Sequence, residues 1–556
     1  MNSVFALLLA LLTAFFGYKF YVGWVDRRVI KPRADRATPA TMYMDGVDFI
    51  PTSKNVLFGY QFKSIAGAAP VVGAILASQW GWLPALLWLL LGVFFIGWVH
   101  DYGSAMVSVR EEGQSLGALS HKLISPRARV ILLVFIYFYL LLVAGAFGAI
   151  IAKLLAAEAS AAFGIIILTL AGVLAGQMIY RWKTDILLTS LVAVIIAIAG
   201  ILAGRLITSD LLVGSLAGNT LLWAAFAFVF CYLGATLPIW RFAQPVNYVS
   251  FYIVALGLLL GGIGVFVGHP NFTIPSFTRP IIEIGPIWPI LFVTIACGAV
   301  SGWHSLVSTS GTAKQLESEA DARPVCAGSM FAEMILGVLA LITAAATFGT
   351  MGEYREAMGK GAGTVFSLGL GKLFAYLGIP AEFGETFGAV LIVILAITVM
   401  QLVLRFMRVA TVELVGDRAP IMRNMHVATL VACVLAFLLV STGWWQYLWI
   451  LFGGSNQLMA SLALLIISVW LVTNRRAATF ALIPMFFMFI TTVAALGYTS
   501  YSLLAQVFTG QVAAEHLVGN ALMGVVAIFL IVAAFILAKD GLAALQANWG
   551  KRQDAT

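Results

Sequence analysis

Long apolar runs fill this chain from end to end, and short polar stretches separate them. A helix needs about 20 apolar residues to cross a bilayer, and each run is close to that length. A sixteenth stretch, residues 364–377, is shorter and rich in glycine, and we expect a re-entrant or surface helix there. We predict fifteen spans, at residues 3–24, 56–79, 82–109, 130–155, 163–180, 186–206, 220–238, 247–267, 288–311, 328–347, 382–404, 425–441, 447–472, 478–500 and 517–538.

The runs are continuous and do not alternate between apolar and polar positions, which excludes an outer-membrane barrel. Helices satisfy their own backbone hydrogen bonds in hydrocarbon, so the spans are predicted to be helical. The composition agrees, because 62% of the 556 residues are hydrophobic and only 10% are charged. A soluble protein carries about 45–50% and about 25%, respectively. The predicted fold class is an all-α polytopic membrane protein with about 15–16 transmembrane helices, and a soluble enzyme is excluded.

Basic residues divide the predicted loops into two groups. Arginine or lysine follows every odd-numbered span, as at Arg27, Arg110 and Lys539, whereas most alternate loops have few basic residues. The long loop at 348–381 is the exception. Because positive residues favour the cytoplasm, we predict a multi-pass protein with its N-terminus outside and its C-terminus in the cytoplasm. The net charge of +8 is assigned to these loops and not to nucleic acid binding.

Two predicted spans contain residues that interrupt a helix. The second carries Gly67 and Pro70, and the ninth carries Gly298 and Gly302 among small polar residues. Glycine and proline destabilise a helix by about 1 and about 3 kcal/mol, and a break inside a membrane is tolerated only where protein or water meets the backbone. The two spans are an odd number apart and therefore run in opposite directions, which is typical of inverted repeats that bind a solute at the breaks. Close helix packing through small residues is the alternative.

These breaks predict a substrate site. Backbone N–H groups at the start of a half-helix favour an anion such as a carboxylate. The adjacent amides Asn456 and Gln457 form a third polar patch, which either joins this site or makes ordinary hydrogen bonds between helices. The candidate substrate-binding residues are Lys63, Ser64, Gly67, Ala68, Pro70, Gly298, Ser301, Gly302, Trp303, His304, Ser305, Asn456 and Gln457.

Ionisable residues occur at four places inside the apolar spans: Lys63, His100-Asp101, His304 and Glu333. Each lies nine or ten residues from a charged residue at the cytoplasmic edge, so all four share one layer near the middle of the bilayer. We predict that Asp101 and Glu333 exchange a coupling proton or monovalent cation, with His100 and His304 beside them. One alternative is a structural ion pair of Lys63 with Asp101 or Glu333. Another, less favoured, is a metal site of the two histidines and two carboxylates, which no HxxxH or HExxH spacing supports.

Four stretches resemble the carbon starvation protein A (CstA) family of bacterial inner-membrane proteins. They are FGYQFKSIAGAAPVVGAILA (58–77), GWVHDY (97–102), TIACGAVSGWHSLVSTSGTAKQL (294–316) and LFGGSNQLMA (451–460). The resemblance implies a secondary transporter of peptides or pyruvate, with proton coupling in the pyruvate branch. It also implies a fold related to the amino acid–polyamine–organocation superfamily, with a leucine-transporter-like inverted repeat and extra helices. The second and ninth spans would then be the first and sixth core helices.

The chain departs from the family pattern in two places. Tyr60-Gln61 stands where many members have two histidines, and Lys63 replaces a small residue. Ala389 and Thr398 stand where the family often has acidic residues. A proton or cation site is therefore expected to be lost there, with Lys63 supplying a fixed positive charge instead.

Together these features predict an inner-membrane transporter for a small nutrient: a peptide, pyruvate or an amino acid. We divide the chain into an N-terminal anchor and basic loop (1–55), a first part of the core with both breaks (56–347), an extracytoplasmic loop with a short helix (348–381) and C-terminal helices (382–556). No cofactor and no nucleic acid partner is expected, the lipid bilayer surrounds the protein, and the oligomeric state is open. Alternatives are a channel or a non-transporting membrane protein with a structural layer of ion pairs. An enzyme is not expected, because no GxSxG, HExxH or P-loop motif occurs.

Overall fold

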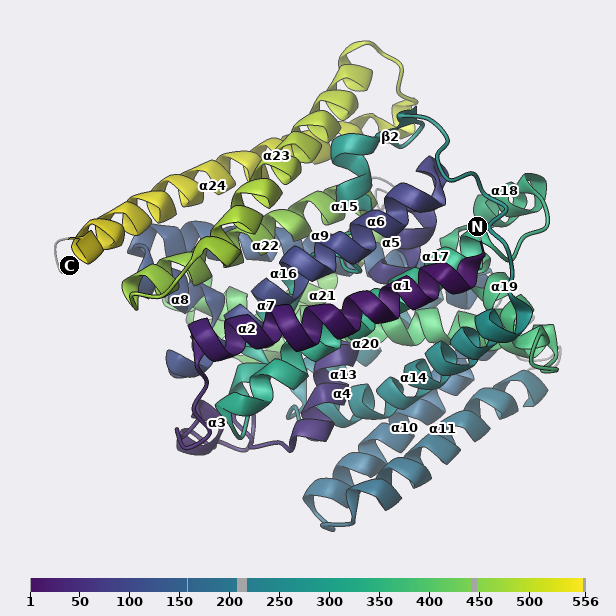
Figure 1. Cartoon of the computed structure of the whole chain (residues 1–556), viewed down its shortest axis with the longest axis horizontal. Helices are drawn as coiled ribbons and strands as arrows, with labels where there is room; N and C mark the ends of the chain where they lie inside the picture. The colour runs from purple at the N-terminus through teal and green to yellow at the C-terminus, as the bar shows by residue number, and fades with distance from the viewer. Residues whose placement is uncertain (1, 158, 208–217, 442–447, 554–556) are drawn as a thin grey trace.

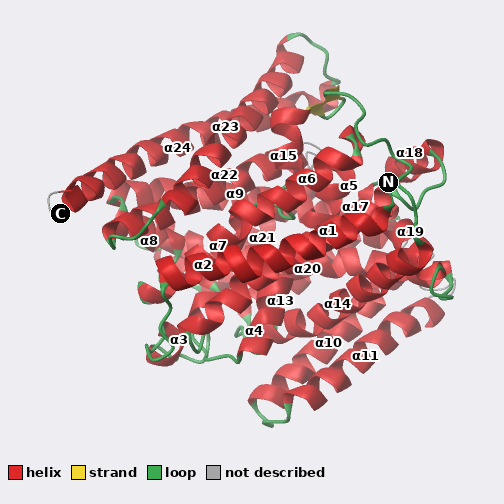
Figure 2. Cartoon of the chain, in the orientation of Figure 1, coloured by secondary structure: helices red, strands yellow, loops and turns green. Residues whose placement is uncertain are grey.

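The protein is a bundle of tilted helices, as the computed structural model shows (Figure 1 and Figure 2). The structure describes residues 2–157, 159–207, 218–441 and 448–553. The two ends of the chain lie at opposite ends of the bundle (Figure 1). An odd number of spans gives this arrangement.

Seventeen named elements lie in the described residues up to Gly268. They are α1 (Ser3–Phe16), η1 (Gly17–Val22), α2 (Gly23–Val25), η2 (Asp26–Ile30), α3 (Pro39–Met42), α4 (Lys54–Ile65), α5 (Ala69–Ala77), η3 (Ser78–Trp80), α6 (Trp82–Gly92), η4 (Val93–Gly97), α7 (Trp98–Arg110), α8 (Leu116–Leu123), α9 (Pro126–Ala157), α10 (Ser160–Tyr180), α11 (Ile186–Ile207), α13 (Thr220–Thr236) and α14 (Ala243–Gly268).

The second half of the chain begins with a short hairpin, whose two strands have two residues each, and this hairpin leads into the second broken helix. Its elements are β1 (Ile281–Ile282), β2 (Gly285–Pro286), η5 (Ile287–Leu291), α15 (Phe292–Thr294), α16 (Gly302–Ser310), η6 (Thr312–Lys314), η7 (Glu319–Asp321), η8 (Arg323–Ala327), α17 (Gly328–Ala345), α18 (Met351–Lys360), α19 (Ala362–Ala375), α20 (Ala381–Val415), η9 (Pro420–Arg423), α21 (Met425–Ser441), α22 (Leu448–Thr473), α23 (Thr479–Phe508) and α24 (Ala514–Gln553).

Helices occupy all fifteen predicted spans. Among the described residues, eleven helices are long and apolar enough to cross a membrane, and the bent pair formed by α4 and α5–η3 makes a twelfth. Two more predicted spans, α13 and α21, are helices of 17 residues and fall just below that length. The last, 288–311, is interrupted after Thr294 and so contains no single long helix. The predicted multi-span helical class is confirmed, although a count by length alone gives fewer than fifteen spans.

The sixteenth apolar stretch is a short buried helix, α19, so of the two expected forms the surface helix is wrong and the re-entrant helix stays a prediction. Its Val365, Leu370 and Phe374 are fully buried. Glycines allow this packing, because a Cβ on Gly369 would lie 2.6 Å from the backbone oxygen of Thr343 in α17. With 14 residues, α19 is about 21 Å long and too short to cross the bilayer alone.

Two hairpins of long helices cover opposite edges of the bundle. Helices α10 and α11 pack on each other at one edge, and α23 and α24 pack on each other at the other (Figure 1). Helices α20 and α22 lie between them, and in each of them 94% of the most apolar 18-residue segment is buried. Side chains for a central site can therefore come from α20 and α22 on one side and from the broken helices on the other.

The two broken helices run antiparallel, as the sequence predicted. Just before α4, the N–H of Thr52 donates to the carbonyl of Gln315, which follows α16 (3.0 Å). At the other end, Gly73 of α5 approaches the end of α15 so closely that a Cβ would lie 2.5 Å from the oxygen of Thr294. The start of one broken helix thus lies beside the end of the other, and the two breaks meet between them.

Gly302 is predicted to be essential for this packing. A Cβ there would overlap Met459 and lie 2.6 Å from the backbone nitrogen of Ala460 in α22. We expect Gly302→Ala to lower the stability of the purified protein by about 1–3 kcal/mol. Gly497→Ala is the matched control, because nothing lies within 4 Å of its added Cβ and alanine favours a helix by about 0.5–1 kcal/mol. Equal melting temperatures for the two variants would contradict the close approach of α16 to α22.

Candidate functional site

The first break separates α4 from α5 by three non-helical residues, and the two helices meet at 45°. Ala66 leaves the helical region at φ −70°, ψ 82°. Pro70 is the second residue of α5, where its missing N–H costs no hydrogen bond. No side chain caps the start of α5, so its first N–H groups are available to a ligand.

Lys63 is a residue of α4 and contacts the backbone of the first break. Its fully buried ammonium donates to the hydroxyl of Thr398 in α20 at 2.6 Å and to the carbonyl of Ala66 at 3.3 Å. Among the described residues, no carboxylate lies within 4.0 Å of it, so the proposed ion pair of Lys63 with Asp101 or Glu333 is wrong. Lys63 instead reaches Thr398, one of the two positions where the family pattern predicted an acidic residue.

The second break spans residues 295–301, between α15 and α16. Asn456 of α22 holds it: its side-chain oxygen accepts from the N–H of Trp303 (3.0 Å) and from the hydroxyls of Ser301 (3.2 Å) and Tyr139 (2.8 Å). Gln457 donates to the carbonyl of Phe292 at 2.7 Å. Of the two interpretations of this amide pair, the structure therefore displays hydrogen bonding between helices, directed at the backbone that the break frees.

The breaks touch each other. The indole N–H of Trp303 donates to the carbonyl of Ser64 at 2.7 Å. A Cβ on Gly298 would lie 3.3 Å from Pro70. Asn247 of α14 donates to the hydroxyl of Ser64 at 3.1 Å and so joins the site from a third direction.

His304 lies between two buried carboxylates. Its Nδ1 is 3.1 Å from Asp101 Oδ2 on α7, and its Nε2 is 3.2 Å from Glu333 Oε2 on α17. His100 Nδ1 lies 2.7 Å from the other oxygen of Asp101. Each of these four side chains is 0% exposed. Two helices, α7 and α17, thus present carboxylates to one imidazole ring on α16.

The two carboxylates are held differently. Asp101 Oδ2 is hydrogen-bonded to His304, and His100 accepts from the N–H of Ser301 at 3.3 Å, which ties this side of the cluster to the second break. The alignment of Glu333 with His304 falls short of a hydrogen bond, and neither Glu333 oxygen has a hydrogen-bond partner among the described residues. Among these residues Asp101 Oδ1 also lacks a hydrogen-bond partner, but Glu333 is the carboxylate with both oxygens unpartnered and so has more capacity to bind a proton or a ligand donor.

The structure gives no support to the metal alternative. The carboxylates face opposite nitrogens of His304, so the ring lies between them and not beside a common centre. Within the described ranges, no group of three or more His, Cys, Asp and Glu side chains has the arrangement to hold a metal ion.

Most predicted site residues lie around the two breaks, with some differences in role. Ser305 lies 3.4 Å from His100, whereas Gly67 packs against the side chains of Phe147 and Val399. The candidate site residues predicted from the sequence did not include Thr398, Tyr139 or Asn247. Asn247 was detectable by the criterion that singled out Asn456, a polar amide inside an apolar span, but the pairing of Thr398 with Lys63 depends on how the helices face each other.

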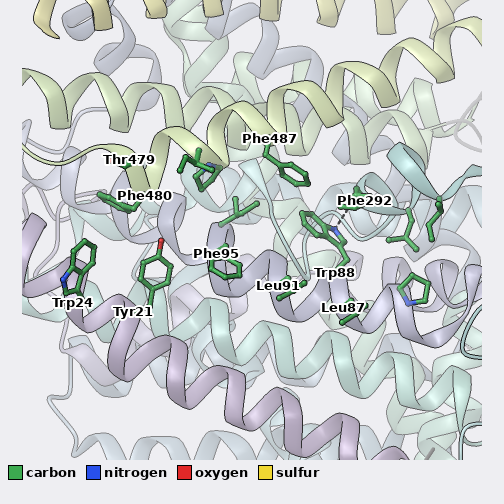
Figure 3. Close-up of a pocket in the computed structure, with 16 residues that line it drawn as sticks. Tyr21, Trp24, Leu87, Trp88, Leu91, Phe95, Phe292, Thr479, Phe480 and Phe487 are labelled. Atoms are coloured by element: carbon green, nitrogen blue, oxygen red, sulfur yellow. Dashed lines mark hydrogen bonds between the residues drawn. The ribbon is translucent and has the colours of Figure 1, made fainter.

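A cavity of about 900 Å³ lies apart from these residues (Figure 3). Aromatic and aliphatic side chains from η1–α2, α6–η4, η5–α15 and α23 line it, among them Trp24, Phe95 and Phe487. None of the ionisable residues at the breaks lines it. Its apolar lining excludes it as the site for a charged nutrient.

Comparison with solved structures supports the fold. The chain matches the manganese transporter of Eremococcus coleocola with a TM-score of 0.51 at 13% identity, over 91% of this chain and 99% of that chain. Together with the antiparallel broken helices, this similarity places the chain in a class of helical membrane folds with discontinuous core helices.

The model of the carbon starvation protein CstA family matches residues 2–356 and 345–495. The chain therefore belongs to the CstA family. It is 29% identical to the peptide transporter CstA of Bacillus subtilis over 97% of this chain and 96% of that protein. It is 32% identical to the pyruvate/proton symporter BtsT of Escherichia coli, over 59% of this chain and 47% of that protein. The chain thus covers nearly the whole of the first relative and about half of the second.

The network around Asn456 predicts a graded loss of stability. Asn456→Leu strands the N–H of Trp303 and the hydroxyl of Tyr139 and leaves the hydroxyl of Ser301 with the thiol of Cys297, and each unsatisfied buried group costs about 1–3 kcal/mol. Tyr139→Phe removes one donor and leaves Asn456 its other partners, so we expect a loss of about 1 kcal/mol. Thermal unfolding in detergent measures both. A smaller loss in Asn456→Leu than in Tyr139→Phe would show that Asn456 does not support the break.

Proposed function

We propose that this protein is an inner-membrane symporter that takes up a small carboxylate-bearing nutrient, a short peptide or pyruvate, together with a proton. The observation that carries the proposal is His304, which contacts Asp101 and Glu333 beside two antiparallel helix breaks. The names of the relatives, a peptide transporter and a pyruvate/proton symporter, support the two substrate classes.

A carboxylate fits the first break. The uncapped start of α5 offers backbone N–H groups and the positive end of a helix dipole. Lys63 lies at the opposite side of the break and adds a positive charge. The N–H groups at the start of α16 are less available, because Trp303 already donates to Asn456. We therefore assign the substrate carboxylate to α5 and the rest of the substrate to the surface formed by Trp303 and Ser64.

Proton coupling fits the His304 cluster. An imidazolium at His304 presents one N–H to Asp101 and one to Glu333, so the three groups hold α7, α16 and α17 together. A proton that binds Glu333 cancels its charge and with it the attraction to His304. Glu333 and α17 are then released from α16, which carries the second break. In this way proton binding changes the position of the helix that contacts the substrate.

Lys63 replaces a bound monovalent cation in this proposal. A free cation in such a break is held by backbone carbonyls and hydroxyls, and the ammonium of Lys63 already contacts one of each, at Ala66 and Thr398. The proton then remains as the coupling ion.

The sidedness follows from the loops. With the basic loops in the cytoplasm, the N-terminus lies outside and the C-terminus inside. Uptake then runs from the end of the bundle that holds the N-terminus toward the basic end.

Neutral variants of the two carboxylates test the coupling. We expect Asp101→Asn and Glu333→Gln to reduce substrate-dependent proton uptake into proteoliposomes to background, because neither can exchange a proton. Glu356→Gln is the control, since its exposed carboxylate contacts only Lys360 on the same helix. Uptake at the wild-type level in both buried variants would favour the alternative of a structural ion-pair layer. Conductance without saturation would favour a channel.

The fixed charge of Lys63 makes a separate prediction about ions. We expect wild-type uptake under a proton gradient to stay within about twofold when choline replaces sodium, because Lys63 already fills the cation position. Lys63→Thr empties that position, so uptake should fall in choline buffer and recover in sodium. A sodium requirement in the wild type would contradict the assignment. Thr398→Val, which removes one partner and keeps the ammonium, should remain independent of sodium.

A further inference from the structure

A second cavity, with a polar lining, lies at the end of the bundle that carries the basic loops. Its volume is about 550 Å³, and it opens between the ends of the first membrane helix, α7 and α22. None of its residues belongs to the site at the helix breaks. Its lining consists of Lys31, Arg33, Arg36, Arg110, Glu111, Trp470, Asn474 and Arg476.

Positive charge is in excess in this cavity. Five cations line it, and two carboxylates partly neutralise them: Glu319, which Arg110 and Arg36 share, and Asp35, which pairs with Arg33. Glu111, the one acid in the lining, already pairs with Lys122 outside it at 2.6 Å.

Lys31 and Arg476 are the cations without such a partner. Across the part of the chain that the structure describes, neither has a carboxylate within the 4.0 Å of an ion pair. Two positive charges therefore face the cavity with no counter-charge of their own.

Two arginines packed on one tryptophan form the floor of the cavity. The guanidinium of Arg110 forms a two-pronged contact with Glu319, at 3.2 and 3.0 Å, and lies 5.8 Å from the centre of the Trp470 ring. Arg476 lies 5.4 Å from the same ring and donates to the carbonyl of Val29 at 2.7 Å. Two guanidiniums that contact one indole repel each other, and burial together with the nearby Arg110 lowers the pKa of Arg476. An anion between them relieves this repulsion.

The cations at the rim of the cavity are exposed. Lys31 is exposed, with its backbone in the left-handed region at φ 49°, and Arg33 and Arg36 are at least half exposed. A pair of arginines packed on one indole, with exposed cations around it, suits an anion with several oxygens, because guanidinium forks match phosphate geometry. The position at the ends of three membrane helices is the level of lipid headgroups.

We propose that this cavity is a binding site for a phosphate-bearing anion, either a phospholipid headgroup or free phosphate. The bound anion bridges the first membrane helix to α7, which carries Asp101, and to α22, which carries Asn456. It therefore stabilises the ends of two helices that build the transport site.

Thermal unfolding of the delipidated full-length protein tests the proposal. One arm titrates inorganic phosphate against chloride at equal ionic strength, and the other titrates phosphatidylglycerol against phosphatidylcholine in mixed micelles. A ligand that binds only the folded protein raises the melting temperature. A rise in the first arm identifies free phosphate as sufficient, and a rise in the second arm alone identifies the headgroup. No rise in either arm overturns the proposal.

Variants assign the effect to the cavity. The double variant Lys31→Asn/Arg476→Gln should weaken binding about tenfold or more, because each basic residue near the surface contributes about 1 kcal/mol. Lys31→Asn alone should weaken it less and keep the fold, since asparagine tolerates the left-handed conformation and the Lys31 ammonium makes no ion pair within the described ranges. Arg475→Gln is the matched control, because Arg475 is exposed and does not line the cavity. Equal binding by the wild type and the double variant would place the anion elsewhere and overturn the proposal.

Discussion

A broken helix inside a membrane frees backbone groups that only the protein can satisfy, and the centre of this structure is organised around that requirement. At the second break, Asn456 binds the N–H of Trp303 and Gln457 binds the carbonyl of Phe292. At the first break, the carbonyls of Ser64 and Ala66 accept from Trp303 and Lys63. Each break is thus completed by side chains, which come from α22, from the other broken helix and, at Ala66, from Lys63 of α4 itself. In the proposed mechanism, a substrate at the breaks competes with or extends these contacts, so its binding acts on helix positions.

The same need for a partner applies to the buried charges. A buried carboxylate is costly unless a positive or hydrogen-bonding partner meets it. Asp101 and Glu333 share the imidazole of His304, and Asp101 also lies 2.7 Å from Nδ1 of His100. In the proposed cycle, a proton that binds Glu333 changes the charge of this cluster. Lys63 donates its hydrogen bonds to neutral oxygens of Ala66 and Thr398, and its charge attracts that of Glu333 from beyond ion-pair distance.

Much of the fold could be predicted because the bilayer imposes simple rules on sequence. Span length located all fifteen helices, and the parity of loops between the two breaks gave their antiparallel directions. Counting residues from the membrane edge placed Asp101, His304 and Glu333 in one layer, and the structure brings these three together. The same count put Lys63 in that layer but suggested the wrong partner. Distance along a helix gives depth, whereas the direction in which a side chain points depends on helix rotation and packing. For the same reason Thr398 was noticed only as a departure from the family pattern.

The burial of the whole cluster sets a condition on any transport cycle. His100, Asp101, His304 and Glu333 are each inaccessible, so neither a proton nor a substrate reaches them without movement of helices. Helix α16 is tied to α22 through the bonds of Asn456, and its contact with α7 includes a hydrogen bond between His304 and Asp101. Its contact with Glu333 lacks a well-aligned hydrogen bond. The boundary between α16 and α17 is therefore the weakest polar contact of the cluster. In the proposed cycle, opening there first exposes Glu333 while the bonds that shape the second break stay intact, so proton exchange precedes any rearrangement at the breaks.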